Sequence, residues 1–179
     1  MRTKLGFAFI LLLIVFSAFK TQEASPEQLE WDTHFQGEPD EHSAYAAVTA
    51  TKWQYSYTSK IRNNKLSIDF KFLAGVEPEK SWVKRNRIRD RQVSRKLLNH
   101  EQGHVYINYL LLKDGEITIR DQRYTIGNYK RLIQSTANKV SNHYSNMQDR
   151  YDKETKHGSD DEAQARWDEF LLKEMSRFD

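Results

Sequence analysis

The chain has 179 residues, which suits one domain with a hydrophobic core and is short for two. Charged residues make up 30% of the chain, but nine Tyr, nine Phe and four Trp supply enough core material to exclude a disordered protein. The absence of cysteine excludes disulfides, thiolate metal ligands and a lipid-carrying cysteine. Any metal ion must therefore be bound by His, Asp or Glu.

The N-terminus has the pattern of an export signal. Arg2 and Lys4 precede or flank the apolar run LGFAFILLLIVFSAF at residues 5–19, which has the length of a signal core and is short for a membrane span. The sequence predicts a signal peptide at residues 1–19, with an uncleaved N-terminal anchor as the alternative, and a single domain at residues 20–179. We therefore expect a secreted or periplasmic protein that contacts a membrane only through an uncleaved N-terminal segment.

Removal of the signal also changes the charge argument. Without Arg2 and Lys4 the chain has 26 basic and 25 acidic residues, so its net charge gives no reason to expect a nucleic-acid partner. The basic run from Lys84 to Lys96 is interpreted as the solvated face of a helix.

The first predicted elements are a helical turn and a β-hairpin. SPEQLEW, at residues 25–31, begins with a capping-box pattern and predicts a short helical turn. Apolar and polar side chains alternate over residues 52–57 and again over residues 65–72, as in strands with one buried face. The turn-like IRNNK between them predicts that the two strands form a hairpin.

Three helices are predicted after the hairpin. Helical spacing of apolar residues predicts a long helix over residues 86–112, ended by Gly115. EITIR and QRYTIG, which follow, are ambiguous, and a short hairpin insertion is one interpretation. A second helix is predicted over residues 128–152. Ser159 and Glu162 form a capping box for a last helix that extends to Leu172.

The candidate site is the sequence His100-Glu101-Gln102-Gly103-His104 in the long helix. Residues four apart lie on one helix face, so both histidines can bind one ion, and Glu101 can reach a water molecule on that ion. Zinc lowers the pKa of such a water to roughly 7, and the carboxylate can accept its proton as it attacks a carbonyl. The surrounding apolar residues favour an interior metal site over a chance match on a solvated helix face.

A third zinc ligand must come from elsewhere, because catalytic zinc normally has three protein ligands. His157 is the preferred candidate, since it lies between two predicted helices and is followed by Gly158. Glu154 and Glu162 are the carboxylate alternatives. The other histidines are less suitable, because His34 and His42 lie in a polar stretch before the sheet and His143 is expected on a solvated helix face.

Tyr151 and Asp152, which precede His157 in the sequence, are candidates for supporting roles. Tyr151 is predicted as a catalytic residue that hydrogen-bonds the oxyanion of the tetrahedral intermediate, with a place in the hydrophobic core as the alternative. Asp152 is a candidate to accept the second N–H of a ligating histidine, with a solvated helix end as the alternative.

Three segments resemble a known family. SWVKR, LLNHEQGHVYI and YDKETKHGSDDEAQARWDEFL are similar to the bacterial family named domain of unknown function 922, described as predicted secreted zinc-dependent proteases. The resemblance extends from about Leu29 to Leu172. It implies that His100, His104 and His157 are the zinc ligands. This chain departs from the family pattern at Lys156, whose ammonium must point away from a bound ion.

Together these observations predict an α+β, zincin-like domain in which a small antiparallel sheet packs on the motif helix and two further helices follow. The predicted function is hydrolysis of peptide bonds in a peptide or protein substrate by a Zn²⁺-dependent peptidase with Glu101 as general base. The alternatives are a non-catalytic envelope binding module and a metal-dependent amidase that acts on cell-wall peptide. The substrate is expected to lie extended along the strand Lys65–Phe72.

Overall fold

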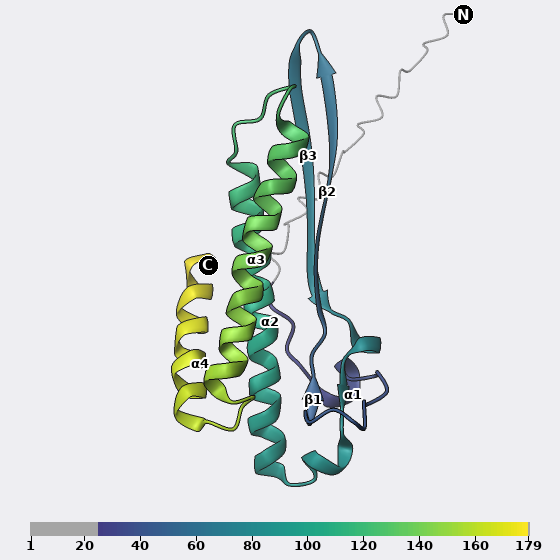
Figure 1. The fold of residues 1–179 in the computed structure, drawn as a ribbon, viewed down its shortest axis with the longest axis vertical. Helices are drawn as coiled ribbons and strands as arrows, with labels where there is room; N and C mark the ends of the chain where they lie inside the picture. The colour runs from purple at the N-terminus through teal and green to yellow at the C-terminus, as the bar shows by residue number, and fades with distance from the viewer. Residues whose placement is uncertain (1–24, 179) are drawn as a thin grey trace, which may run out of the picture.

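The computed structural model describes residues 25–178, so the signal peptide predicted at residues 1–19 lies outside the described residues (Figure 1). Within these residues the fold is α+β, with two small antiparallel sheets and four α-helices. The elements follow in the order α1 (Trp31–His34), β1 (Ala47–Val48), β2 (Thr51–Arg62), β3 (Lys65–Val76), η1 (Pro78–Lys80), β4 (Trp82–Val83), η2 (Arg85–Ile88), α2 (Arg91–Arg120), α3 (Tyr129–Thr155), α4 (Asp161–Met175) and η3 (Ser176–Phe178).

The predicted hairpin is formed by β2 and β3, and both strands are longer than the alternating patterns indicated. The strands pair in register from Thr51 opposite Val76 to Arg62 opposite Lys65. Asn63 and Asn64 both have positive φ angles, of 48° and 59°, as a two-residue hairpin turn requires. Asparagine tolerates this backbone conformation better than most residues.

A second, much smaller sheet joins distant parts of the chain. Ala47 of β1 pairs with Val83 of β4, and Val48 pairs with Trp82. These strands pack with α1 against the N-terminal half of α2, in a cluster that includes Val105. This cluster fixes the segment that contains β1 beside the motif helix.

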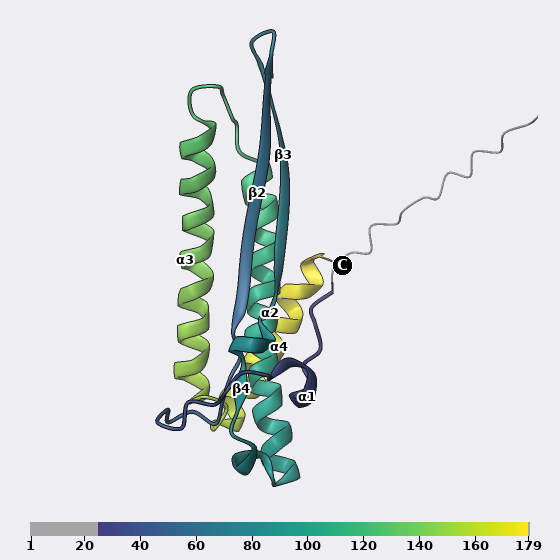
Figure 2. The ribbon, with the colours of Figure 1, turned by 90° about the vertical axis from the view of Figure 1, so that its right-hand side faces the viewer.

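The 30-residue helix α2 is the centre of the fold (Figures 1 and 2). The side chain of Asp90 caps its N-terminus by accepting hydrogen bonds from the backbone N–H groups of Gln92 and Val93. The inner face of the hairpin packs against the C-terminal half of α2 and the start of α3, where Phe70, Ile119 and Ile133 form one cluster. The helices α3 and α4 pack on the middle of α2 through a second cluster that includes Ile107, Leu110 and Leu111.

The prediction that Gly115 ends the motif helix is wrong, because the helix continues to Arg120. Gly115 is buried, and a Cβ at this position would lie 3.0 Å from Cζ2 of Trp53. The glycine therefore allows the Trp53 ring to approach the helix backbone. EITIR forms the last turns of α2, so there is no hairpin insertion at that position.

The predicted helical turn in SPEQLEW is also wrong. Residues 25–30 have no regular secondary structure, and α1 begins at Trp31. The reason is a tertiary contact, because the Gln102 side chain accepts from the Leu29 N–H and donates to the Glu27 carbonyl. These backbone groups are satisfied by α2 instead of by a local helix.

The two C-terminal helices match the predictions closely. The predicted helix over residues 128–152 is α3, which continues to Thr155. The last helix is α4, although its cap is Asp160, one residue after the predicted Ser159. No helix within residues 25–178 has both the length and the apolar composition needed to cross a membrane.

Candidate metal centre

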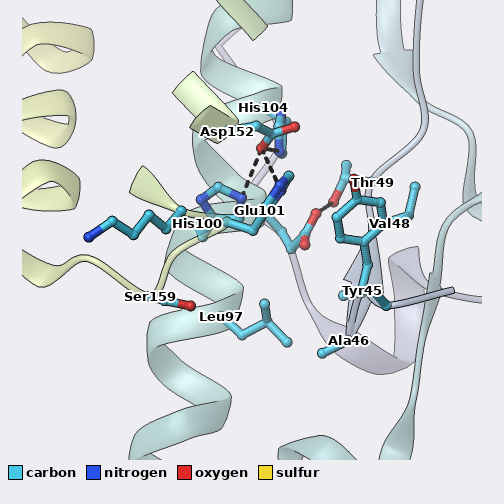
Figure 3. A pocket seen from close by; sticks show the side chains of 14 residues that line it. Tyr45, Ala46, Val48, Thr49, Leu97, His100, Glu101, His104, Asp152 and Ser159 are labelled. Atoms are coloured by element: carbon cyan, nitrogen blue, oxygen red, sulfur yellow. Dashed lines mark hydrogen bonds and ion pairs between the residues drawn. The ribbon is translucent and has the colours of Figure 1, made fainter. Parts of the chain in front are cut away.

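A cleft of about 490 Å³ lies between the N-terminal half of α2, the segment 44–49 and the end of α3 with its following loop (Figure 3). One wall is made of small and apolar side chains, which are Ala44, Ala46, Ala47, Val48 and Leu97. The polar wall contains the groups predicted from the sequence, which are His100, Glu101, His104 and His157, together with Asp152. The fold thus brings the helix motif and the loop histidine to one cleft.

The two motif histidines point toward one carboxylate oxygen. His100 Nε2 lies 3.2 Å from Asp152 Oδ1, and His104 Nε2 lies 3.1 Å from the same atom (Figure 3). The His100 side chain is only 2% exposed and that of His104 is 15% exposed. Both imidazoles therefore lie on the interior face of α2, as their spacing predicted.

His157 reaches the same oxygen from the loop after α3. Its Nδ1 lies 3.5 Å from Asp152 Oδ1, and its side chain is 46% exposed. The approach depends on three consecutive residues with positive φ, Lys156, His157 and Gly158. A Cβ at Gly158 would lie 2.8 Å from the Cβ of His100, so only glycine allows the loop to pass this close to α2.

Hydrogen bonds on the outer side of His100 determine which of its nitrogens carries the proton. Gln164 donates through Nε2 to Asp168 Oδ1 and to the Tyr151 hydroxyl, at 2.8 Å each. Because a carboxylate only accepts, this amide must present its oxygen to His100 Nδ1, 3.2 Å away. Nδ1 of His100 therefore carries hydrogen, and Nε2 has a free lone pair.

His104 is held in the same tautomer by a different glutamine. Gln148 donates through Nε2 to the backbone carbonyl of His104 at 3.1 Å. Its Oε1 consequently faces His104 Nδ1 at 2.5 Å and accepts the Nδ1–H hydrogen bond. The Nε2 lone pair of His104 is thus also directed at Asp152.

This arrangement fits a bound cation. When both imidazoles are neutral, their Nε2 lone pairs and the carboxylate oxygen are all acceptors that face one another, so a cation or a proton must lie between them. Asp152 Oδ1 is buried and has no hydrogen-bond partner within the described chain. Tetrahedral zinc with bonds of roughly 2.0–2.1 Å has ligands about 3.3 Å apart, close to the 3.1–3.5 Å that separate Oδ1 from the three histidine nitrogens. Among the described residues, only His100, Asp152 and His157 have ligand atoms that all lie within 4.8 Å of one another, so His104 must move closer to the other two histidines to bind the same ion.

The contacts between Asp152 and the histidines also shift the pKa values of these groups. Burial disfavours a charged His104, but without a metal ion the contact with Asp152 and the negative charges of Glu101 and Asp152 outweigh it and raise the pKa of His104. A proton on Nε2 can thus take the place of a cation opposite Asp152. Burial would raise the pKa of Asp152, but the contacts with His100 and His104 hold that pKa well below its usual range. Asp152 is therefore an anion that can balance the charge of a metal ion.

Asp152 thus differs from its predicted place. It was expected to accept the outer N–H of a ligating histidine, but it lies on the inner side, opposite both Nε2 atoms. The outer acceptors are Gln164 and Gln148. Asp152 is consequently a further candidate ligand, and its oxygen lies within 4.8 Å of the ligand atoms of His100 and His157.

Glu101 also lines the cleft, but it forms no hydrogen bond with the three histidines. Its side chain turns toward the opposite wall, where Oε2 accepts a hydrogen bond of 2.6 Å from the Thr49 hydroxyl (Figure 3). The residue is only 3% exposed. Thr49 therefore holds a buried carboxylate at the border of the cleft, beside the predicted metal ligands.

Tyr151 is not placed for its predicted role at the oxyanion. Its side chain is fully buried and stacks on the His100 ring on the side away from the cleft, with ring centroids 4.7 Å apart. Its hydroxyl donates to the His100 backbone carbonyl at 2.8 Å. A Cβ at Gly103 would lie 2.2 Å from this hydroxyl, so Gly103 provides the space for Tyr151. Tyr151 supports the motif helix and does not face a substrate.

The alternative ligands lie outside the cleft. Glu154 accepts a hydrogen bond from the Trp167 indole at 2.8 Å, and Glu162 is exposed in the first turn of α4. His143 is exposed on α3, as predicted. The ammonium of Lys156 is directed to Asp160, 3.0 Å from its Oδ2, with which it forms an exposed ion pair.

The polypeptide edge beside the cleft belongs to β1 and not to β3. The Lys84 N–H bonds to the Ala46 carbonyl, so Ala46 directs its backbone groups to β4. Peptide groups alternate along a strand, and Ala47, which lines the cleft, consequently directs its groups away from β4. The strand Lys65–Phe72, on which substrate was expected, contributes no residue to the cleft.

Comparison with known proteins identifies the family. Residues 16–158 match the family model described as "Bacterial protein of unknown function (DUF922)". The chain is a DUF922 protein. No curated protein and no solved structure shows significant similarity to it. In this DUF922 protein the match includes all three predicted histidine ligands and ends at Gly158, whereas Gln164 and Asp168 lie beyond it.

Three residues of the site were not found from the DUF922 sequence. Gln164 precedes Trp167 and Leu171 at helical spacing, and Gln148 lies between Tyr144 and Tyr151 at helical spacing, so each is a polar residue on an apolar stripe. A polar residue that interrupts an apolar stripe is the sequence feature from which both glutamines could have been predicted. Thr49 has no comparable signal, because its contact with Glu101 depends on the packing of β1 against α2.

Proposed function

We propose that this DUF922 protein is a zincin-like, zinc-dependent hydrolase of peptide bonds that acts outside the cytoplasm. The observation that supports the proposal most strongly is the convergence of three histidine nitrogens on Asp152 Oδ1, at 3.1–3.5 Å. His100, His104 and His157 would hold the zinc ion together with or in exchange with Asp152. The position of the site after an N-terminal export pattern supports an extracytoplasmic function.

A zinc ion held there would supply a Lewis acid that activates water and polarises the substrate carbonyl. The protein supplies the orientation of the ligands, because Gln148 and Gln164 present both Nε2 lone pairs to the site. The half-buried Asp168 supports Gln164 in turn. This prior arrangement reduces the reorganisation that the site needs during catalysis.

Glu101 is the proposed general base. Its carboxylate takes a proton from the attacking water and gives it to the leaving nitrogen. The hydrogen bond from Thr49 occupies Oε2 and restricts the rotation of the carboxylate. The role requires a proton to move between Glu101 and the cleft, and the pocket lining places Glu101 at the cleft surface.

An extended peptide is the proposed substrate. In this proposal the peptide pairs with the outward edge of β1 at Ala47, which lines the same cleft as the histidines, and the small side chains of Ala44 and Ala46 line that cleft as well. Added backbone hydrogen bonds would align the scissile bond without requiring one sequence. This placement replaces the strand Lys65–Phe72 predicted from the sequence.

The test is Glu101→Gln in the full-length, zinc-loaded protein. The amide keeps the size of the side chain but cannot take the proton, so cleavage of unfolded casein should fall by about a thousandfold. Zinc content and thermal melting should remain near those of the wild type. Glu162→Gln, at an exposed position on α4, is the matched control and should leave all three measurements unchanged.

Two results would reject this function. Undiminished cleavage by Glu101→Gln would exclude Glu101 as the base. A wild-type protein that binds zinc but cleaves neither unfolded proteins nor cell-wall peptides would instead identify a binding module.

A further inference from the structure

The end of the β2–β3 hairpin projects beyond the helices that support the rest of the sheet (Figures 1 and 2). The helix α2 ends at Arg120, whose guanidinium donates to the carbonyl of Phe70 at 3.2 Å. Leu66 is the outermost residue in the groove between the hairpin and this end of α2. The residues beyond it form a tip that is almost entirely exposed.

The tip has an excess of positive charge. We define the cationic tip as Lys60, Ile61, Arg62, Lys65 and Leu66. Its three cations are exposed and form no ion pair with any described residue, and residues 59–68 contain no acidic side chain.

The strand register adds an electrostatic cost. Arg62 lies directly opposite Lys65. Like charges at opposed positions destabilise a hairpin. Binding of an anionic surface would remove this repulsion.

The same tip has an exposed aliphatic face. Ile61 is 52% exposed and lies opposite Leu66 in the register. Side chains alternate along a strand, so Ile61 points to the opposite face from its neighbours Lys60 and Arg62. The tip therefore combines an aliphatic pair with cations, which is the combination that binds the interface of a membrane with anionic lipids.

We propose that the cationic tip binds an anionic phospholipid surface, with its cations on the headgroups and Ile61 and Leu66 at the boundary of the acyl chains. This contact is independent of the N-terminal segment and of the proposed catalytic function. β2 has 12 residues, so the tip lies roughly 40 Å from the start of that strand. The cleft borders the chain just before β2, and tip binding would hold it away from the lipid surface.

The experiment uses the full chain with a polarity-sensitive dye on a single introduced cysteine, because the natural chain has none. Ser67→Cys places the dye at the tip, and Gln92→Cys places it at the start of α2 as a control site. Vesicles of phosphatidylcholine with phosphatidylglycerol should shift the emission of the tip dye to the blue. Vesicles of phosphatidylcholine alone should not, and the dye at the control site should not respond to either.

Matched variants distinguish binding by the cationic tip from an effect of the net charge of the protein. Replacement of Lys60, Arg62 and Lys65 by Gln should weaken binding of the anionic vesicles about a hundredfold, since each cation near such a surface contributes measurably. Replacement of Arg87, Arg89 and Arg91 by Gln changes the net charge equally at the other end of α2 and should weaken binding less than threefold, a small fraction of the effect expected for cations in contact with lipid. Ile61→Ser should reduce the blue shift while it retains the tip cations.

Three results would overturn the proposal. Equal loss in the two triple variants would show that only net charge matters. Unchanged binding by the tip variant, with its melting curve intact, would place the contact elsewhere. An equal response of the tip dye to soluble polyphosphate would show that phosphate, and not a lipid surface, is the ligand.

Discussion

The two halves of the candidate metal centre are held in different ways. His100 and His104 lie on a long helix, are largely buried, and have their outer nitrogens fixed by Gln164 and Gln148. His157 lies on a loop, is 46% exposed, and has the exposed Tyr45 ring 4.6 Å away as a neighbour.

This difference separates the part of the site that is fixed before metal binding from the part that completes it. The helix half is fixed by packing and hydrogen bonds that exist without an ion. The loop half depends on the sequence of left-handed residues that ends at Gly158. We therefore expect the helix half to contribute more to metal affinity, and the loop half to adjust more readily.

The largest effect is expected for His104→Ala. This change removes a preoriented nitrogen and leaves Gln148 without its partner. Stoichiometric zinc binding should be lost when the purified variant is titrated against a fluorescent zinc chelator. Retention of wild-type affinity would show that the helix pair does not hold the ion.

A smaller but still large loss is expected for His157→Ala. The helix pair and Asp152 remain, so residual zinc binding should be measurable, and the fall should exceed the roughly 10–100-fold typical of changes outside the ligand shell. His143→Ala, on the exposed face of α3, is the control and should bind zinc like the wild type. Equal affinity in both variants would remove His157 from the ligand set.

The smallest effect is expected for Gln148→Leu, which retains every ligand but removes the acceptor for His104 Nδ1–H. Zinc affinity should fall roughly 10–100-fold. Gln148→Glu keeps an oxygen acceptor at this position and should restore most of the affinity in the same titration. Failure of Glu to restore it, with normal melting temperatures, would indicate that the hydrogen bond does not orient the ligand.

Local sequence patterns explain which features of the two halves of the site could be predicted. The spacing of His100 and His104 places them on one face whenever the segment is helical. Gly158 likewise indicated an unusual backbone at the loop histidine. These features need no knowledge of the surrounding fold.

The roles of Tyr151 and Asp152 could not be assigned in the same way. Adjacent residues on a helix point about 100° apart, so only one of the two can face the cleft. Which one does depends on the rotation of α3 against α2, and this is set by tertiary packing. The result is that Asp152 faces the histidines while Tyr151 lies behind His100.

Tertiary contacts also explain why two of the secondary-structure predictions were wrong. Gly115 has the composition signal of a helix end, but the approach of Trp53 gives it a packing role within α2. SPEQLEW has a capping pattern, but Gln102 binds its backbone. In both cases a residue distant in sequence outweighed a local preference.

Zinc-edge X-ray absorption of the purified protein, combined with its zinc content, tests the central claim most directly. We predict one zinc ion per chain, bound by several imidazole nitrogens at roughly 2.0–2.1 Å, with this signal lost in His104→Ala. A protein that remains free of zinc at saturating concentrations would contradict the account, as would a bound zinc whose spectrum shows no imidazole ligand.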